Sequence, residues 1–309
     1  METQVQSNPQ LMSKFLFDQS CVRGEHVELD QDWQSMIQYH HYPKCVTRML
    51  GEFTAGTLLL AATIKFNGSV TLQVRGDGPV SMLVVEVQNN LAVRAMAKVS
   101  PNIELSDDMD MTQLINANGK GQCVITLNSF DKVTGQLYQG VVALNSSSVA
   151  TVLENYMLQS EQLHTRFWLA SSAEKIAGML IQKMPDIGGN SENNTDSDAW
   201  NRIVQLTDTI TSDELLSLQG TEVLQRLYWQ EKLQLLACES VVFQCHCSRS
   251  RTDDLLRSLG QKELQEHLEK EHRIDITCQF CNRVQTYDEE DVKNLFINEN
   301  QQTEEKTIQ

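Results

Sequence analysis

A long apolar segment is the clearest feature of the hydrophobic pattern of this chain. Residues 42–66 read YPKCVTRMLGEFTAGTLLLAATIKF, and the second half of this segment is apolar on nearly every helical face. A helix that is hydrophobic all round is usually buried on all sides, and proline is favoured in the first turn of a helix. We therefore expect a helix starting near Pro43 that runs through the middle of a domain.

Short alternating segments follow this helix. Alternating apolar and polar residues occur in five places, at 70–74, 80–87, 91–97, 123–127 and 137–144. Glycine and aspartate separate them, as in Gly76-Asp77-Gly78-Pro79 and in the stretch 131–135. Alternation interrupted by such turn residues predicts antiparallel strands and hairpins. We expect a sheet that packs against the apolar helix.

Helical spacing returns between Ser148 and Lys183, where apolar residues predict two helices, and Pro185 ends the pattern. Together with the strands and the buried central helix, these helices complete the N-terminal part of the chain. The predicted class for residues 1–184 is therefore α+β, a mixed domain of sheet and helix.

The next segment is polar and then helical in pattern. Residues 186–198 read DIGGNSENNTDSD, which predicts a flexible linker. Thr211 and Glu214 have the spacing of a capping box, and residues 221–237 have strong helical periodicity. We predict that residues 185–239 form an acidic helical linker. This linker is too short for a good core of its own, so its helices either pack on the first domain or stay loosely attached.

Charge argues against one class of function. The net charge is −16, and it divides into −4 for residues 1–184, −7 for 185–239 and −5 for 240–309. Phosphate binding needs a basic surface, so we do not expect a nucleic-acid partner. The first ten residues lack an apolar signal region, and no apolar run approaches membrane-spanning length, so we expect no membrane association and a cytoplasmic location.

Four cysteines in the last third of the chain lie in two close pairs. The pairs are Cys245-His246-Cys247 and Cys278-Gln279-Phe280-Cys281. Structural zinc prefers four soft ligands, and closely spaced thiolates supply two from each turn. We expect one zinc ion bound by Cys245, Cys247, Cys278 and Cys281. Residues 240–297 are a segment too small to fold well without such a metal, and the polar tail 298–309 is predicted to be disordered.

Alternatives to this site remain open from the residues alone. His246, His267 or His272 could replace one sulfur, although we expect these histidines on a helix surface or in a loop. Cys278 could instead act as the nucleophile of a thiol-disulfide oxidoreductase, which would require a βαβ context. A third possibility is an inert zinc module that only mediates interactions.

The other four cysteines are scattered, at Cys21, Cys45, Cys123 and Cys238. Their positions do not suggest a secreted disulfide framework, and a reducing compartment is implied. Cys238 stands seven residues before Cys245 and could join disulfide exchange. We favour a role as a small apolar residue on a helix.

Motifs in both halves of the chain resemble one known family. FQCHCSR at 243–249 and CQFCN at 278–282 resemble the paired-cysteine signature of the 33-kDa chaperonin family, the redox-regulated heat-shock protein 33. Three upstream motifs also resemble its N-terminal domain: LGE at 50–52, QVRGDGP at 73–79 and SEQ at 160–162 with the following Thr165. The similarity extends from Tyr42 to about Asp291.

The sequence departs from the family pattern in two places. Arg94 is followed by Ala95 where the family usually has glycine, and Ser250 replaces the glutamate that usually lies between two arginines after the first cysteine pair. The second departure argues against a carboxylate acting beside the metal. All four ligand positions are intact.

The resemblance implies a non-enzymatic chaperone that holds unfolding client proteins without ATP. In such a protein the reduced, zinc-bound form is inactive. Oxidation then forms the disulfides Cys245–Cys247 and Cys278–Cys281, zinc leaves, and the C-terminal domain and linker unfold. The family also suggests homodimers on activation. We expect the freed linker and the surface beneath it to bind clients.

Overall fold

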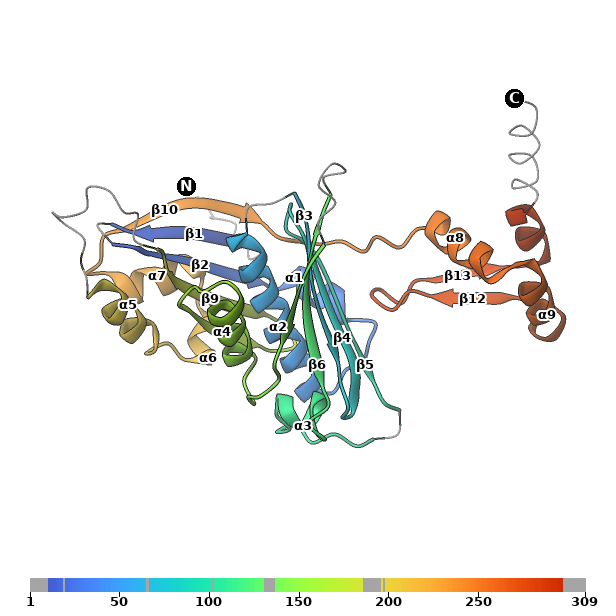
Figure 1. Ribbon diagram of the computed structural model, residues 1–309, viewed down its shortest axis with the longest axis horizontal. Helices are drawn as coiled ribbons and strands as arrows, with labels where there is room; N and C mark the ends of the chain where they lie inside the picture. The colour runs from blue at the N-terminus through green and yellow to red at the C-terminus, as the bar shows by residue number, and fades with distance from the viewer. Residues whose placement is uncertain are drawn as a thin grey trace, which may run out of the picture. The chain divides into compact units, whose positions relative to one another are not determined.

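The computed structural model describes residues 11–18, 20–64, 67–101, 103–130, 137–185, 196 and 198–296 (Figure 1). The chain divides into two compact units, with the boundary between Gln244 and Cys245. They are called the N-terminal and the C-terminal unit below. Most of the predicted flexible linker 186–198 and all of the tail 298–309 lie outside the described residues.

Two β-sheets form the frame of the N-terminal unit. The five-stranded sheet has the order β10-β1-β2-β9-β8 and is antiparallel throughout. Its strands are β1 (Leu11–Phe17), β2 (Val22–Leu29), β8 (Thr165–Ser171), β9 (Ile176–Lys183) and β10 (Leu233–Ser240). The six-stranded sheet has the order β11-β5-β4-β3-β6-β7 and is antiparallel except between β11 and β5. Its strands are β3 (Gly68–Arg75), β4 (Val80–Gln88), β5 (Ala92–Val99), β6 (Gln122–Ser129), β7 (Leu137–Val142) and β11 (Val242–Phe243).

The expected central helix lies between these sheets. Helix α2 (Lys44–Thr63) contacts strands of both, and helix α4 (Val149–Ser160) packs beside it (Figure 1). Since α2 is covered on opposite sides, apolar residues are needed around most of its circumference. Leu50, Phe53, Leu58 and Leu59 are fully buried there. Two short helices, α1 (Gln31–Ile37) and α3 (Met111–Ile115), complete the described part of this region.

The five predicted alternating segments correspond to strands β3 to β7 of the six-stranded sheet, with ends that differ by one or two residues at β5 and β7, and the α+β class is confirmed. The predicted turn at 131–135 falls outside the described residues. One prediction for this region was wrong. Residues 165–183 form the hairpin β8–β9 rather than a second helix after α4, because β9 pairs along its whole length with the distant strand β2.

The linker helices pack on the outer face of the five-stranded sheet. They are α5 (Ala199–Thr207), α6 (Ser212–Ser217) and α7 (Gly220–Tyr228). The capping box at α6 is formed, since Thr211 Oγ1 accepts the Glu214 N–H and Glu214 Oε2 accepts the Thr211 N–H. The helices bury Ile203, Leu215, Val223 and Tyr228 against the sheet. Of the two arrangements that the sequence left open, the structure has the packed one.

The prediction for the end of the helical linker was wrong. The helical pattern of 221–237 predicts one continuous helix, but α7 ends at Tyr228, Trp229 is 73% exposed, and residues 233–240 form strand β10. Most β10 side chains are exposed, so its pairing with the main chain of β1, rather than side-chain burial, defines this strand. Cys238, which we placed on a helix, is therefore an exposed strand residue.

A buried polar cluster fixes the start of α7 to β2. Glu28 Oε1 accepts the Gly220 N–H at 3.2 Å, and Glu28 Oε2 lies 2.7 Å from Lys175 Nζ, which also donates to the Leu218 carbonyl at 3.0 Å. His26 is fully buried beneath Gly220. A side chain at position 220 would clash with the imidazole, so only glycine fits here without displacement.

The His26 environment predicts an acid-dependent loss of stability. Burial, with Lys175 nearby, lowers the His26 pKa to about 4, from the ordinary 6.5. As pH falls from 6.5 towards 4, the imidazole of residue 26 binds a proton in the unfolded chain but stays neutral in the folded chain. The N-terminal unit should therefore lose about 3 kcal/mol through this group. The control variant is His26→Gln. Denaturant unfolding of the wild-type and variant proteins between pH 7 and pH 4.5 measures how their free energies of unfolding differ at each pH.

The comparison with His26→Gln is needed because two other buried groups change the stability with pH in the opposite direction. Burial raises the pKa of Glu25 and of Glu52 to about 7. Each carboxyl keeps its proton in the folded state while the unfolded chain loses it above pH 4.5, so these groups favour folding as pH falls through the same range. An unchanged wild-type minus variant difference across that range would contradict the role assigned to His26.

The C-terminal unit has only a small core. Helices α8 (Arg249–Leu259) and α9 (Gln261–Glu271), the hairpin β12 (Ile274–Thr277) to β13 (Val284–Tyr287), and helical residues 289–296 make up its regular structure. Seven buried hydrophobic residues hold these elements together: Leu256, Leu264, Leu268, Ile274, Tyr287, Val292 and Leu295. So small a core provides little stability without a further constraint.

Candidate metal centre

Two irregular segments of the C-terminal unit carry the four cysteines. Cys245 and Cys247 precede α8, whose first turn is capped by Ser248 Oγ accepting the Arg251 N–H at 3.3 Å. Cys278 and Cys281 lie in the turn between β12 and β13. In that turn the Asn282 N–H donates to the Cys278 carbonyl at 2.9 Å, and Asn282 has a φ of 52°. The tight turn brings both sulfurs to the same side.

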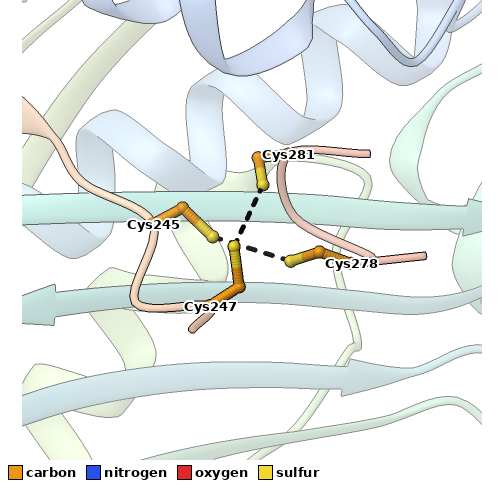
Figure 2. Close-up of side chains that lie close together, drawn as sticks. All are labelled: Cys245, Cys247, Cys278 and Cys281. Atoms are coloured by element: carbon orange, nitrogen blue, oxygen red, sulfur yellow. Dashed lines mark hydrogen bonds between the residues drawn. The ribbon is translucent and has the colours of Figure 1, made fainter. Parts of the chain in front are cut away.

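The four sulfur atoms converge on one point. All lie within 4.8 Å of one another, and the distances between Sγ atoms are 3.6 Å for Cys245 and Cys278 and 3.5 Å for Cys247 and Cys281 (Figure 2). A tetrahedral zinc site with Zn–S bonds of about 2.3 Å has sulfur-to-sulfur edges of about 3.8 Å. These distances far exceed a disulfide bond, and all four cysteines are free. The donor set therefore fits a closed tetrathiolate metal site.

The predicted histidine alternatives are not part of this cluster. The four cysteines are the only group of potential metal ligands found among the described residues. His246, His267 and His272 are absent from it, and His272 forms the left-handed C-cap of α9. Cys45 and Cys123 are buried in the N-terminal unit, while Cys21 and Cys238 are at least partly exposed there. The sequence prediction and the structure thus select the same four sulfurs.

The thiols differ in their electrostatic surroundings. Burial raises the pKa of Cys245, and burial together with the neighbouring thiols raises that of Cys247. Burial also acts to raise the pKa of Cys278, but hydrogen bonds from the Phe280 and Cys281 backbone outweigh it and the net shift is downward. Without a cation, Cys278 therefore loses its proton more readily than Cys245 or Cys247. A divalent metal ion would favour the deprotonated form at all four positions.

A polar network that the sequence analysis missed supports the first cysteine segment. The Arg249 guanidinium lies 2.7 Å from Asp291 and 4.3 Å above the Tyr287 ring. The Tyr287 hydroxyl donates to Asp253 at 2.8 Å, and Arg251 donates to the His246 carbonyl at 3.1 Å. The only signal was Arg249, two residues after Cys247, and the acidic run near 291. This network connects the metal segment to α8, β13 and the last helical residues.

The local topology argues against an oxidoreductase. A redox motif of the thioredoxin type sits at the start of a helix in a βαβ context. Here the Cys278 to Cys281 pair lies in an antiparallel hairpin, and the described strands of the C-terminal unit include no parallel pair. The geometry fits a turn that could supply two metal ligands.

The fold and the site together define a two-unit α+β protein whose small C-terminal unit carries a cluster of four cysteines that could bind a metal ion. The family model described as Hsp33 protein matches residues 10–288. The chain belongs to this family, as the sequence resemblance predicted. Within the described part of the chain, no helix is both long and apolar enough to cross a membrane.

Curated relatives and a solved structure agree with this assignment. The 33 kDa chaperonin of Methylobacillus flagellatus is 41% identical over 93% of this chain and 94% of its own length. That of Shewanella loihica is 39% identical over 93% of this chain and 96% of its length. The crystal structure of the 33 kDa chaperonin from Thermotoga maritima matches the fold with a TM-score of 0.77 at 20% identity, covering 94% of this chain and 99% of that one. Family membership supports a chaperone function, and chaperonins are a non-enzymatic class of protein.

Proposed function

We propose that this protein is a redox-regulated, ATP-independent chaperone that binds unfolding proteins after oxidation. The observation that carries the proposal is the convergence of four free thiols in a unit with a seven-residue core. Structural zinc contributes on the order of 10 kcal/mol or more to the folding of such units. The ligands that stabilise the C-terminal unit are therefore also oxidisable groups.

Oxidation removes the metal because a disulfide sulfur no longer offers the thiolate charge. Each cysteine pair gives two electrons to one equivalent of a two-electron oxidant such as hydrogen peroxide, and the peroxide is reduced to two molecules of water. Two equivalents convert four thiols into two disulfides. Zinc, which the four cysteines would hold in the reduced form, is then released.

The pairing of the disulfides determines what happens next. We propose Cys245–Cys247 and Cys278–Cys281, as the family resemblance implies. The short distances join sulfurs of different pairs, and bonds there would keep the two metal-binding segments together. Bonds within each pair would leave the segments unconnected, so the C-terminal unit would lose its main constraint. Peptide mapping of the oxidised protein distinguishes the two patterns.

The linker provides the client-binding surface in this proposal. Helices α5 to α7 cover an apolar area on the five-stranded sheet, which includes Phe15, Phe17, Val22, Met179 and Ile181. Because β10 and β11 lead directly into Cys245, unfolding after that residue removes an anchor at the end of the linker. Released helices would expose the apolar face, and such patches bind other exposed apolar surfaces.

Hydrogen exchange and aggregation assays on the same samples test the proposal. The oxidised protein should lose its zinc, suppress the aggregation of a thermally unfolding client, and show faster amide exchange in 199–240 and 245–296. The reduced, zinc-loaded protein should do none of these. A zinc-free, oxidised protein with unchanged exchange and no effect on aggregation would refute the proposed switch.

The proposed function also implies a cellular location and an oligomeric state. The thiols must start reduced to hold a metal, which favours the cytoplasm. Exposure of the apolar sheet face also favours association, and we propose that the active form is a homodimer. Sedimentation of the reduced and the oxidised protein measures the oligomeric state. A monomer in both states would contradict the proposed homodimer.

A further inference from the structure

A second site lies in the N-terminal unit, on the face of the five-stranded sheet that points away from the linker helices. A cavity of about 330 Å³ opens where α2 ends. This volume is near the lower end of the range of about 300–1,000 Å³ that is usual for small-molecule sites. The cavity is lined by the last residues of α2 and by parts of β1, β2, β3, β4 and β10.

Most of the cavity wall is apolar. Ala61, Ala62 and Ile64 come from the end of α2, and Val70 and Val87 come from two neighbouring strands of the six-stranded sheet. Leu16 and Leu236 extend this wall on the side of the five-stranded sheet. A hydrocarbon chain would replace water along these surfaces, which is favourable.

Four charged residues from strands of the five-stranded sheet also line the cavity. Lys14 and Glu25 lie directly opposite each other on β1 and β2, and Arg23 lies two residues before Glu25 on the same face. Glu239 of β10 pairs with Lys14 at 3.1 Å. Arg23 is held in place by donating to the Gln182 side chain. Two cations therefore face two carboxyl groups.

Glu25 is the unusual member of this group. It is 2% exposed, and its Oε2 atom has no hydrogen-bond partner among the described residues. Burial raises the pKa of its carboxyl to about 7, although Arg23 and Lys14 act to lower it. With Glu25 protonated, Glu239 is the one remaining carboxylate among the described residues that line the cavity, against the two cations of Lys14 and Arg23. The site then has an excess of positive charge and an unused hydrogen-bonding group.

We propose that this cavity binds a small amphiphilic carboxylate, with its hydrocarbon chain against Ala61, Ala62 and Val87 and its head group between Lys14 and the carboxylic acid of Glu25. A carboxylate supplies the missing negative charge and accepts a hydrogen bond from the protonated acid. An amine would add a third cation, and an alcohol would leave the charge unbalanced. The inference concerns the reduced protein and does not depend on the proposed redox switch.

Calorimetric titration of the reduced, zinc-loaded full chain with sodium octanoate tests the site. Saturable binding of one octanoate per chain is expected, with octanol and octylamine at least about tenfold weaker. Near pH 7 binding should be accompanied by proton uptake, because a bound carboxylate favours the protonated form of Glu25. Titrations in buffers of different ionisation enthalpy measure this uptake.

Three variants locate the binding to this cavity. Lys14→Met should weaken octanoate binding about tenfold or more, and Ala62→Phe should fill the cavity and abolish binding. Glu25→Gln keeps a hydrogen-bond donor, so it should retain binding but lose the proton uptake. Lys98→Met, on an exposed residue outside the cavity, is the matched control and should bind normally. Thermal unfolding shows which variants are folded.

Three results would contradict the proposed carboxylate site. No saturable binding at millimolar octanoate would overturn it. Weak binding of several octanoate molecules that persists in the folded Ala62→Phe and Lys14→Met proteins would also overturn it. Preferential binding of octylamine would overturn the assignment of the ligand as a carboxylate.

Discussion

Replacing Cys281 with serine is expected to abolish zinc binding and to unfold the C-terminal unit while the N-terminal unit stays folded. The remaining three sulfurs cannot complete the tetrahedral thiolate set, and the neutral hydroxyl is a poor ligand for this metal. The lost stabilisation is on the order of 10 kcal/mol, which a core of seven hydrophobic residues cannot replace. The N-terminal unit has its own extensive core between two sheets.

Zinc content per chain and amide exchange measure this result. Amides of α8 and α9 should lose their protection in Cys281→Ser, whereas those of α2 should keep it. Cys238→Ser is the matched control, because Cys238 is an exposed cysteine of the N-terminal unit and lies outside the sulfur cluster. A Cys281→Ser protein that binds no metal yet keeps α8 and α9 protected would show that the metal is dispensable for this fold.

Replacing Gly220 with alanine is expected to loosen the linker helices and to activate the chaperone without oxidation. The added Cβ would lie 2.5 Å from His26 Nδ1, and His26 is fully buried, so the clash falls in a packed region. Forcing such a group into a packed site typically costs about 1–3 kcal/mol. The start of α7 should move away from β2 and lose its contact with Glu28, while the metal site remains intact.

Exchange rates in α7 should rise about tenfold or more in the reduced Gly220→Ala protein, which should also suppress client aggregation with a full complement of zinc. Thr221→Val is the control, since the neighbouring side chain is exposed and makes no such approach to the sheet. If α7 loosens and the reduced variant still fails to protect clients, the covered sheet face is not the client-binding surface.

These two experiments separate the parts of the switch. Cys281→Ser removes the metal and tests whether the C-terminal unit depends on it. Gly220→Ala leaves the metal in place and tests whether release of the linker is sufficient for activity. Activation in the first and not in the second would indicate that the unfolded C-terminal unit itself, rather than the uncovered sheet, binds clients.

Much of the candidate site could be predicted because its signal is local. The spacing within each cysteine pair restricts both sulfurs to one turn, and the structure brings the two pairs within 4.8 Å. The supporting contact of Arg249 with Asp291 was not predictable in the same way. It joins residues more than forty positions apart, and charged residues are common on the surface of any chain.

The sequence by itself determined the elements whose environment follows from their own residues: the buried helix α2, the alternating strands β3 to β7, and the four cysteines that could bind a metal. Only the tertiary structure decided that residues 165–183 and 233–240 are strands, because β2 and β1 supply their hydrogen-bond partners from the distant N-terminus. The same holds for His26 and Glu25. Their ordinary side chains acquire shifted pKa values only where packing removes water from them, and no pattern along the chain records that removal.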